Sequence, residues 1–470
     1  MPRGTQEPTR EVGGHDIRPA LEAQLLKRDG GRRDAGIIEE QVQGAEHADC
    51  FAKQAADVFL DADVAHERVG ARPDLFDLPG NGLEQHLVTT RQIRPARQQA
   101  PRPVLGGNGE RGADAAAHDP PELIILPSGP GALRPGRYFT EHVAPLTGIR
   151  AALGPGVVVL DEKGCDLEGE DRSGFAAATS AASAADVAVV VVGGRSGLQR
   201  EASVGEARDA MDLRLTGPQQ QLVAAVSETG TPTVVVVMSG CAHVLTGVAD
   251  KAAALLVAWP PGEQGGNALA DVLFGRAQPT DRLPVSLPRA TGQVPLYHSH
   301  RAGGAKSMFY ADYTDCAHAP LFAFGHGLAY TSFEHRDLLV AASDTHSGIT
   351  ATVVVANTGQ CPGEQVVQLY ATDLVASVSR PAIQLIGFAR VALEPGQARR
   401  VSFLVHPSRL AFYDEEMDFV VEPGEFTFAT GASAADLRTR ATFELAGTKA
   451  RYSQRSVVAV RYSVEEPVPA

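Results

Sequence analysis

The sequence predicts an α/β domain followed by an all-β sandwich, with a mostly irregular N-terminal leader. The apolar run VAVVVV, residues 187–192, is too short to cross a membrane and is rich in Val, as buried parallel strands are. Ala-rich helical stretches separate such runs, which is the pattern of strand-helix-strand units with right-handed crossovers. Beyond residue 335, apolar and polar residues alternate, which is typical of antiparallel strands. We therefore expect a helix-covered, mostly parallel sheet and then a β-sandwich.

The composition indicates a globular protein whose partners are not polyanions. The 470 residues include 42 Lys and Arg against 56 Asp and Glu, which gives a formal net charge of -14. This charge disfavours nucleic acid and anionic membranes as partners. The five cysteines are widely spaced and form no CxxC pair that would indicate zinc or redox chemistry. The N-terminus lacks the apolar core of a secretory signal, and no run of about 18 apolar residues follows, so we expect a cytoplasmic protein without a membrane segment.

Residues 1–115 differ from the rest of the chain. They contain no Tyr or Trp, are dense in Arg, Gln, Pro and Gly, and show no sustained period. The composition of residues 18–27 and 37–60 is compatible with two short helices, but neither segment has an apolar stripe. We interpret this segment as an irregular leader, either an ordinary extension or a segment that is not a native domain.

The α/β pattern begins near residue 138. We expect helices at 145–153, 174–185 and 218–229 and strands at 157–160, 187–192 and 233–238. A last helix follows the apolar run 252–262, with Asn267 as its cap and Gly275 at its end. Ligands bind outside the carboxyl ends of parallel strands, so the carboxylates of the loop at 195–209 are candidates for a site.

Alternating runs at 348–359, 364–373, 399–407, 424–433 and 439–447 predict an antiparallel sandwich of roughly seven strands. The resulting division of the chain is a leader at 1–115, an α/β domain at 116–290, a connector at 291–334, a sandwich at 335–447 and a tail at 448–470.

Six stretches in order along residues 140–447 carry a family resemblance. They are APLTGIRAALGPG with GCD, GEARDAMDLRLTGPQQQLVAAV, WPPGEQGGNALADVLFG, DRLPVSLP, PLFAFGHGLAYTSFEH, and NTGQCPGEQVVQLYATD with RPAIQLIGFARVALEPGQARRVSF. They resemble the C-terminal half of glycoside hydrolase family 3, the β-glucosidase and β-xylosidase family. The resemblance implies an α/β-sandwich domain, a fibronectin type III-like domain, and a β-linked glucoside or xyloside oligosaccharide as substrate. It implies no cofactor and no metal.

Retaining hydrolysis, the mechanism of this family, needs two carboxyl groups that flank the glycosidic bond. The resemblance assigns the general acid/base to Glu206 in SVGEARD, with Glu201 as the alternative because the register of this loop is open. The family nucleophile is an Asp in a Ser-Asp-Trp-type motif on an N-terminal barrel, and this sequence contains no such motif. We therefore expect a truncated glycosidase with weak or no activity alone; the alternative is a non-catalytic remnant or a carbohydrate-interacting module.

Several other positions are interpreted structurally. His326 in FGHGLAY is expected to pack at a domain junction, and His298 with His300 to form a surface pair, because a metal site needs a third ligand. Trp259 ends an apolar run and is interpreted as core rather than as a sugar-stacking platform. The family's first α/β strand, normally followed by a Gly-Pro-Asn turn, is not recognised, and residues 121–131 are its candidate replacement.

Overall fold

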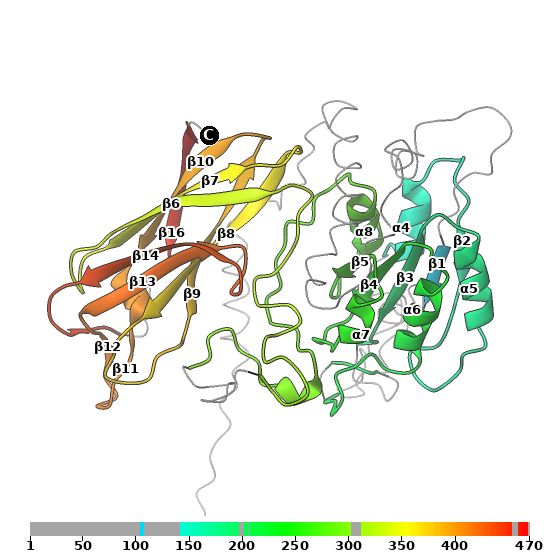
Figure 1. The fold of residues 1–470 in the computed structure, drawn as a ribbon, viewed down its shortest axis with the longest axis horizontal. Helices are drawn as coiled ribbons and strands as arrows, with labels where there is room; N and C mark the ends of the chain where they lie inside the picture. The colour runs from blue at the N-terminus through cyan, green and yellow to red at the C-terminus, as the bar shows by residue number, and fades with distance from the viewer. Residues whose placement is uncertain are drawn as a thin grey trace, which may run out of the picture. The chain divides into compact units, whose positions relative to one another are not determined.

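The structure is a computed structural model, and it describes residues 104–107, 142–196, 202–205, 207–301, 312–453 and 459–468. The described residues form the α/β domain and the β-sandwich that the sequence predicts (Figure 1). The segments 18–27, 37–60 and 121–131, for which we expected helices or a strand, lie outside the described residues.

A five-stranded sheet organises the α/β domain, with the order β2-β1-β3-β4-β5 and parallel pairing throughout. The strands are β1 (Val104–Gly107), β2 (Leu160–Glu162), β3 (Ala188–Gly193), β4 (Thr233–Met238) and β5 (Ala254–Val257). From β1 the chain first adds β2 on one side and then β3, β4 and β5 on the other. The strand order therefore reverses between β1 and β3, which is the topological switch point of the sheet.

Helices cover both faces of the sheet (Figure 1). Val189 and Val191 of β3 belong to an apolar cluster with residues of α4 and α8, whereas Val190 and Val192 belong to a cluster with residues of α5, α6 and α7. Because side chains alternate between the faces of a strand, every residue of β3 is buried. The helices are α4 (Pro145–Ala152), α5 (Phe175–Ser183), α6 (Gln219–Ser227), α7 (Thr246–Ala249) and α8 (Gly265–Leu273).

Two glycines allow α4 and α8 to pack with their backbones in contact. A Cβ atom on Gly148 would lie 2.1 Å from the carbonyl oxygen of Gly266, and one on Gly266 would lie 2.2 Å from the carbonyl oxygen of Ala144. The N–H of Gly266 donates to the carbonyl of Val143 at 2.8 Å. Any larger side chain at either glycine would force the two helices apart.

The sheet begins earlier in the chain than the expected boundary at residue 116. β1 lies inside the expected leader and pairs with both β2 and β3. The candidate replacement for the first strand at residues 121–131 lies outside the described residues. A four-residue strand that contains two glycines carries no usable hydrophobic period, which is why periodicity did not reveal it.

Two local predictions in this domain were wrong. β2 begins at Leu160 rather than at residue 157. Asn267 does not cap α8; Gln264 occupies the cap position, and Asn267 Nδ2 donates to Gln264 Oε1 at 2.7 Å. The helix begins before Asn267 because the Val143 carbonyl already accepts from an N–H of its first turn. Gly275, at φ 67°, ends the helical segment as expected.

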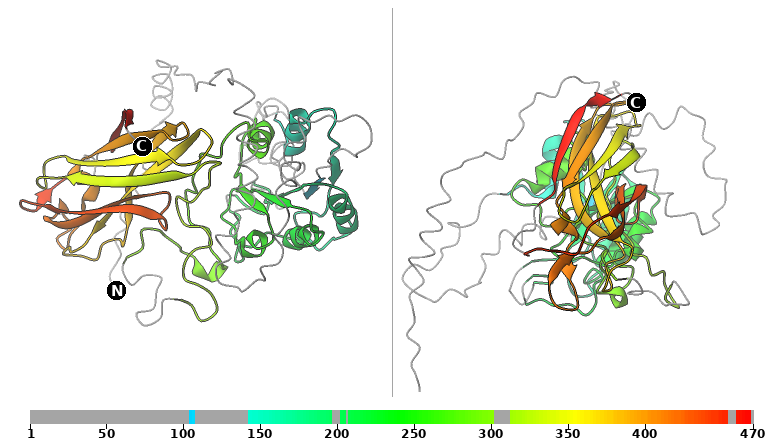
Figure 2. Two further views of the ribbon diagram at one scale, coloured as in Figure 1. Left: turned by 45° about the horizontal axis from the view of Figure 1, so that its top comes forward. Right: turned by 90° about the vertical axis from the view of Figure 1, so that its left-hand side faces the viewer.

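The β-sandwich consists of two four-stranded antiparallel sheets, β16-β10-β7-β6 and β14-β13-β8-β9, with a small three-stranded sheet, β11-β12-β15 (Figure 2). Large side chains from both four-stranded sheets, such as Phe403 of β10 and Phe428 of β13, fill one shared core. The longer strands are β6 (Phe333–Ala341), β7 (Ile349–Asn357), β8 (Gly363–Asp373), β9 (Gln384–Leu393), β10 (Ala398–Val405), β13 (Gly424–Gly431), β14 (Leu437–Leu445) and β16 (Arg461–Val468). The short strands are β11 (Phe412–Tyr413), β12 (Phe419–Val421) and β15 (Ala450–Arg451).

The expected tail at 448–470 contains part of the sandwich. β16 pairs with β10, with Val464 opposite Val401, and Val464 packs against the core. The segment shows little alternation and contains Pro467, which argued against a strand. β16 lies at the edge of its sheet, where a strand tolerates proline because one side needs no hydrogen-bond donors.

Polar contacts join the connector and the end of the α/β domain to the sandwich. Gln368 Nε2 donates to the carbonyl of Gly325 at 3.0 Å, and Arg282 Nη2 donates to Gln365 Oε1 at 3.0 Å. Gly325 has φ 80° and no space for a side chain, since a Cβ would lie 2.0 Å from Gln368 Oε1. His326 stacks on Phe322 with ring centroids 5.2 Å apart, in agreement with its interpretation as a packing residue.

Candidate active site

The segment after β3, residues 194–213, leaves the sheet at the topological switch point, and we call it the β3 loop. In open sheets of this strand order, ligands bind outside the carboxyl ends of the strands at that point. Glu206 and Glu201, the two candidates for the acid/base, both belong to the β3 loop and lie outside the described residues. The structure does describe the chain on both sides of position 206.

The backbone at the carboxyl end of β3 is held by a buried glutamine. Gln219, at the start of α6, accepts from the Gly193 N–H at 2.8 Å and donates to the Gly193 carbonyl at 2.9 Å. Gly193 has no space for a side chain, because a Cβ would lie 1.8 Å from the carbonyl oxygen of Met238. The Gly194 N–H donates to the same carbonyl at 3.0 Å. The point where the β3 loop begins is therefore fixed.

The first half of the β3 loop folds back on its own start. The N–H groups of Ser203 and Val204 both donate to the carbonyl of Arg195, at 3.0 and 3.1 Å. Ser203 Oγ in turn accepts from the Arg195 N–H at 3.1 Å. Ala202 and Val204 are 4% and 5% exposed, so apolar burial also holds this half of the loop.

The two residues that flank position 206 have unusual backbone angles. Gly205 has φ 117° and Ala207 has φ 56°. The left-handed region costs a non-glycine residue such as Ala207 about 1 kcal/mol or more. The N–H of Arg208 donates to the carbonyl of Gly205 at 3.2 Å. Strain of this kind persists where the surrounding structure imposes it, and it concentrates at functional sites.

The second half of the β3 loop ends at Leu213, whose backbone makes three hydrogen bonds outside the loop. Its N–H donates to Thr291 Oγ1 at 3.1 Å. Its carbonyl accepts from the Val244 N–H at 2.9 Å and lies 3.0 Å from His243 Nδ1. His243 Nε2 lies 2.8 Å from Ser239 Oγ. These partners belong to the turn after β4 and to the connector.

The protonation of His243 follows from its partners. A carbonyl can only accept, so Nδ1 carries the proton and Nε2 accepts from the Ser239 hydroxyl. Burial lowers the pKa of His243, opposed by its hydrogen bond to Leu213. The sequence reasoning missed this pair. The signal was a Ser and a His four residues apart, directly after a buried strand.

The turns after β3, β4 and β5 approach one another. A Cβ on Gly194 would lie 3.1 Å from Ser239 Oγ, and one on Gly240 would lie 3.9 Å from Pro260 Cγ. Trp259, at the end of β5, is partly buried and packs against the apolar cluster that includes residues of α5, α6 and α7. This contact agrees with its interpretation as a core residue.

The two histidines interpreted as a surface pair have separate contacts. The ring of His298 stacks on Phe324 with centroids 3.9 Å apart and meets Tyr370 edge-on at 6.3 Å. His300 Nδ1 lies 3.0 Å from the carbonyl of Arg301. His298 is therefore half-buried, with Phe324 and Tyr370 beside its ring. Burial lowers the pKa of His298, and His300 is close enough to contribute to this shift.

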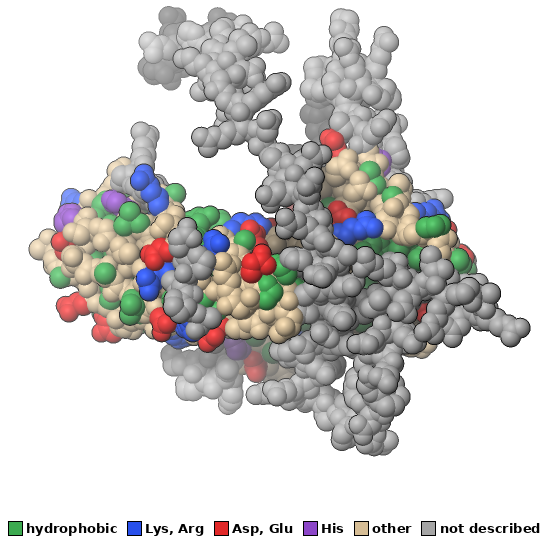
Figure 3. Space-filling model, turned by 90° about the horizontal axis from the view of Figure 1, so that it is seen from above, with side chains coloured by type: hydrophobic (Ala, Val, Ile, Leu, Met, Phe, Trp, Pro, Cys, Tyr) green, Lys and Arg blue, Asp and Glu red, His purple; other side chains and the backbone are tan. Residues whose placement is uncertain are grey.

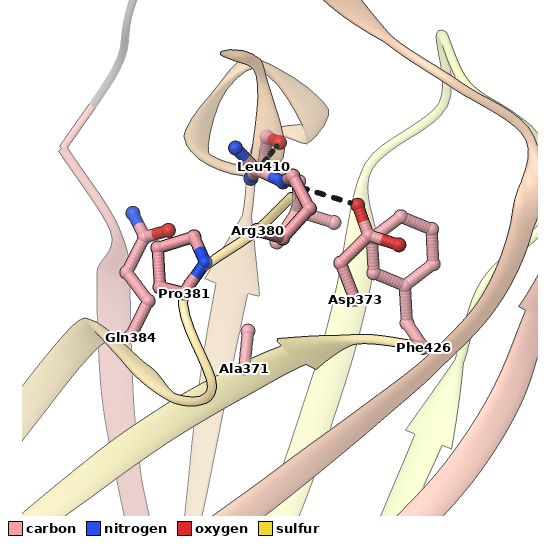
Figure 4. Close-up of a pocket in the computed structure, with 7 residues that line it drawn as sticks. All are labelled: Ala371, Asp373, Arg380, Pro381, Gln384, Leu410 and Phe426. Carbon is pink, nitrogen blue, oxygen red and sulfur yellow. Dashed lines mark hydrogen bonds and ion pairs between the residues drawn. The ribbon is translucent and has the colours of Figure 1, made fainter. Parts of the chain in front are cut away.

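A small cavity in the sandwich does not serve as a sugar site. Its volume is about 10 Å³, which is room for about one water molecule. Its lining includes the ion pair between Arg380 Nε and Asp373, at 3.3 Å (Figure 4). The Arg380 guanidinium also lies 4.2 Å from the centre of the Phe412 ring. Burial raises the pKa of Asp373 even though Arg380 opposes this shift.

Comparisons with protein families identify two domains in the chain. Residues 105–330 match the glycosyl hydrolase family 3 C-terminal domain, and residues 365–434 match a fibronectin type III-like domain. The chain carries the C-terminal domain of glycoside hydrolase family 3, followed by a fibronectin type III-like domain. The match begins within β1, in agreement with a sheet that starts before residue 116.

Relatives of this chain are named as glycosidases. The periplasmic β-glucosidase of Salmonella typhimurium is 35% identical over 333 residues, which are 65% of this chain and 43% of the relative. A β-xylosidase of Formosa agariphila is 37% identical over 309 residues, which are 63% of this chain and 41% of the relative. The chain thus spans less than half the length of these relatives.

Solved structures of β-glucosidases share the fold. A β-glucosidase from Listeria innocua, solved in complex with glucose, superposes with a TM-score of 0.62 at 25% identity, over 76% of this chain and 47% of that chain. A β-glucosidase from Erythrobacter marinus gives a TM-score of 0.63 at 29% identity, over 78% of this chain and 48% of that one.

The location of the protein and its partners stay predictions. None of the helices that the structure describes has the length and apolar character needed to cross a membrane. The Salmonella relative is named periplasmic, so the expected cytoplasmic location is not confirmed. On the face drawn in Figure 3, acidic side chains in red and basic side chains in blue are interspersed.

Proposed function

We propose that this chain supplies the acid/base half of a retaining β-glycosidase active site, with Glu206 as the proton donor and acceptor. The observation that carries the proposal is the β3 loop, which leaves the sheet at its switch point and is held on both sides of position 206 by hydrogen bonds to Arg195 and Leu213. The names of the family 3 relatives support a β-linked glucoside or xyloside as the substrate.

The proposed role follows from the chemistry of retention. In the first step a neutral carboxylic acid donates its proton to the glycosidic oxygen while the nucleophile attacks the anomeric carbon. In the second step the resulting carboxylate takes a proton from water, which then displaces the enzyme carboxylate from the sugar. One glutamate thus acts in both steps, first as the acid and then as the base.

The nucleophile of this reaction belongs, in our proposal, to a barrel domain of the family. The printed sequence contains no Ser-Asp-Trp-type motif, and its only Trp is Trp259. We therefore expect little hydrolysis of an aryl β-glucoside by the 470-residue chain alone. Addition of a family 3 barrel domain in trans is expected to give turnover.

The test compares the variants Glu206→Gln and Glu201→Gln, each mixed with the barrel domain supplied in trans. The two substitutions are chemically matched and lie in the same loop. With a phenyl β-glucoside, whose leaving group needs protonation, Glu206→Gln should lower kcat by about 10²- to 10⁴-fold. With a dinitrophenyl β-glucoside, whose leaving group needs no protonation, the first step should be nearly unaffected. Glu201→Gln should leave both rates close to those of the parent chain.

The reverse pattern would assign the acid/base to Glu201. Equal rates for both variants and the parent would refute the acid/base role of the β3 loop. If no barrel restores turnover and the folded chain still binds β-gluco-oligosaccharides, the alternative of a carbohydrate-interacting module replaces the proposal. The absence of a Ser-Asp-Trp-type motif from the given sequence is the observation that favours this alternative.

A further inference from the structure

We propose that His243 and Ser239 are positioning residues that set the place of the carboxylate-bearing half of the β3 loop. The inference rests on the proposed function for its link to Glu206, but the contacts that carry it are independent of that function. They form one directed chain of hydrogen bonds from the turn after β4 to the end of the loop.

The direction of every bond in this chain is fixed by its partners. The Cys241 N–H donates to Ser239 Oγ at 3.2 Å. The Ser239 hydroxyl donates to His243 Nε2 at 2.8 Å, and His243 Nδ1–H donates to the Leu213 carbonyl at 3.0 Å. Each donor polarises the next, so the bonds strengthen one another in a buried site. The imidazole is thereby held in one tautomer and one orientation.

Burial contributes little to most of the described residues in the second half of the β3 loop. Val204 is 5% exposed, but the next described residues are mostly exposed, and Met211 is 97% exposed. Arg208 and Leu213 are half-buried, and Leu215 is 6% exposed. The hydrogen bonds of Leu213 therefore hold the end of the mostly exposed stretch 207–212.

The imidazole of His243 links two turns of the α/β domain. The side chain of His243 is 6% exposed, and both ring nitrogens have partners on two different turns. A nonpolar residue of similar size would fill the same space with no link between them. The imidazole thus contributes a connection between the turn after β4 and the β3 loop in addition to its packing.

Hydrogen exchange of the full chain tests the proposal without any need for turnover. In His243→Leu, the amides of residues 202–213 should exchange about three- to tenfold faster, the effect of one lost net hydrogen bond on local opening. The amides of β3 and β4 should be unchanged. His335→Leu is the matched control, because His335 is a buried histidine of the sandwich that is 5% exposed. It should leave the β3 loop unaffected.

A conservative variant and a spectroscopic measurement separate positioning from packing. His243→Asn keeps an N–H donor near the position of Nδ1, so exchange in the β3 loop should return close to the parent rate. Nitrogen NMR of the imidazole should show a neutral ring that is protonated at Nδ1. An Nε2-protonated ring, or equal loop exchange in His243→Leu and His335→Leu, would overturn the proposal.

The outcome is distinguishable from that of the proposed function. If His243→Leu loosens the β3 loop but Glu206→Gln leaves turnover unchanged, the positioning role stands and the acid/base assignment fails. In the mixture that shows turnover, His243→Leu should lower kcat with KM unchanged, and His243→Asn should recover most of kcat. A rise in KM with kcat unchanged would contradict a role in positioning the acid/base.

Discussion

The side-chain amide of Gln219 hydrogen-bonds both backbone groups of Gly193, at 2.8 and 2.9 Å, in the manner of a neighbouring strand. Gly193 is the last residue of β3, and Gln219 is 0% exposed. One side chain therefore completes the hydrogen bonding of the strand at the point where the β3 loop begins.

Replacement of Gln219 by Met should strongly destabilise the α/β domain. Methionine has nearly the same size, but the N–H and the carbonyl of Gly193 would both lose a buried partner, at a cost of about 2 kcal/mol or more. Urea unfolding measures the difference. Gln221→Met on the exposed face of α6 is the control and should change stability by less than about 0.5 kcal/mol. Similar unfolding midpoints for both variants would contradict the role of Gln219.

Replacement of Gly148 by Ala should separate α4 from α8. The added Cβ would lie 2.1 Å from a backbone oxygen that has no freedom to rotate away, so we expect a loss of about 1 to 3 kcal/mol. Gly154→Ala, in the turn after α4, is the control because its Cβ would meet nothing within 4 Å. A thermal midpoint of Gly148→Ala equal to that of the control would show that the helices are further apart than described.

The stability of the sandwich should fall in acid because of His335. Burial, followed by the positive charge of Arg438 and opposed by Asp436, lowers the pKa of His335 to about 3. In the unfolded chain, the His335 side chain binds a proton near the ordinary histidine pKa of about 6.5. In the folded chain it stays neutral at that pH. Stability is therefore fully present above about pH 6.5 and declines toward pH 3, by at most about 1.4 kcal/mol per pH unit.

The measurement is urea unfolding of the sandwich between pH 7 and pH 4. His335→Gln should be less stable at pH 7, because the bond to Thr430 Oγ1 is disturbed, but its stability should vary less with pH. His346→Gln, a change at an exposed histidine of the same domain, should retain the parent slope. A parent slope that persists in His335→Gln would assign the acid sensitivity to other groups.

Replacement of Val464 by Ala tests whether β16 belongs to the sandwich. Val464 packs partly buried against the core and lies opposite Val401 of β10, so we expect a loss of about 1 kcal/mol. Glu465→Ala is the control, because its exposed pair with Arg400 contributes between about 0 and 1 kcal/mol. If residues 461–468 were a free tail, neither change would alter the unfolding midpoint.

Sequence patterns predicted the elements that are long or fully buried. β3 and β4 were predicted because both are runs of Val that helices cover on two faces, and Gly275 because a left-handed helix end favours glycine. β1 and β16 were missed, because each is recognised only by the strands beside it. The prediction that Glu206 is the acid/base came from the family resemblance rather than from periodicity.

The positioning pair could not be predicted from sequence. His243 lies 4 residues from Ser239, which a pattern can detect, but 30 residues from Leu213. Only the packing of the turn after β4 against the β3 loop brings these groups together. The same limit applies to His298, whose stacking partner Phe324 is distant in the sequence and follows the residues 302–311 that are not described.

The central place of β1 has a consequence for the smallest fragment that can fold. A polypeptide that begins at residue 116 would lack the strand on which both β2 and β3 pair. The Val-rich edge of β3 would then be open to other molecules, and such edges promote aggregation. Autonomous folding of this domain therefore requires a start upstream of Val104, although almost all of its recognisable sequence lies downstream.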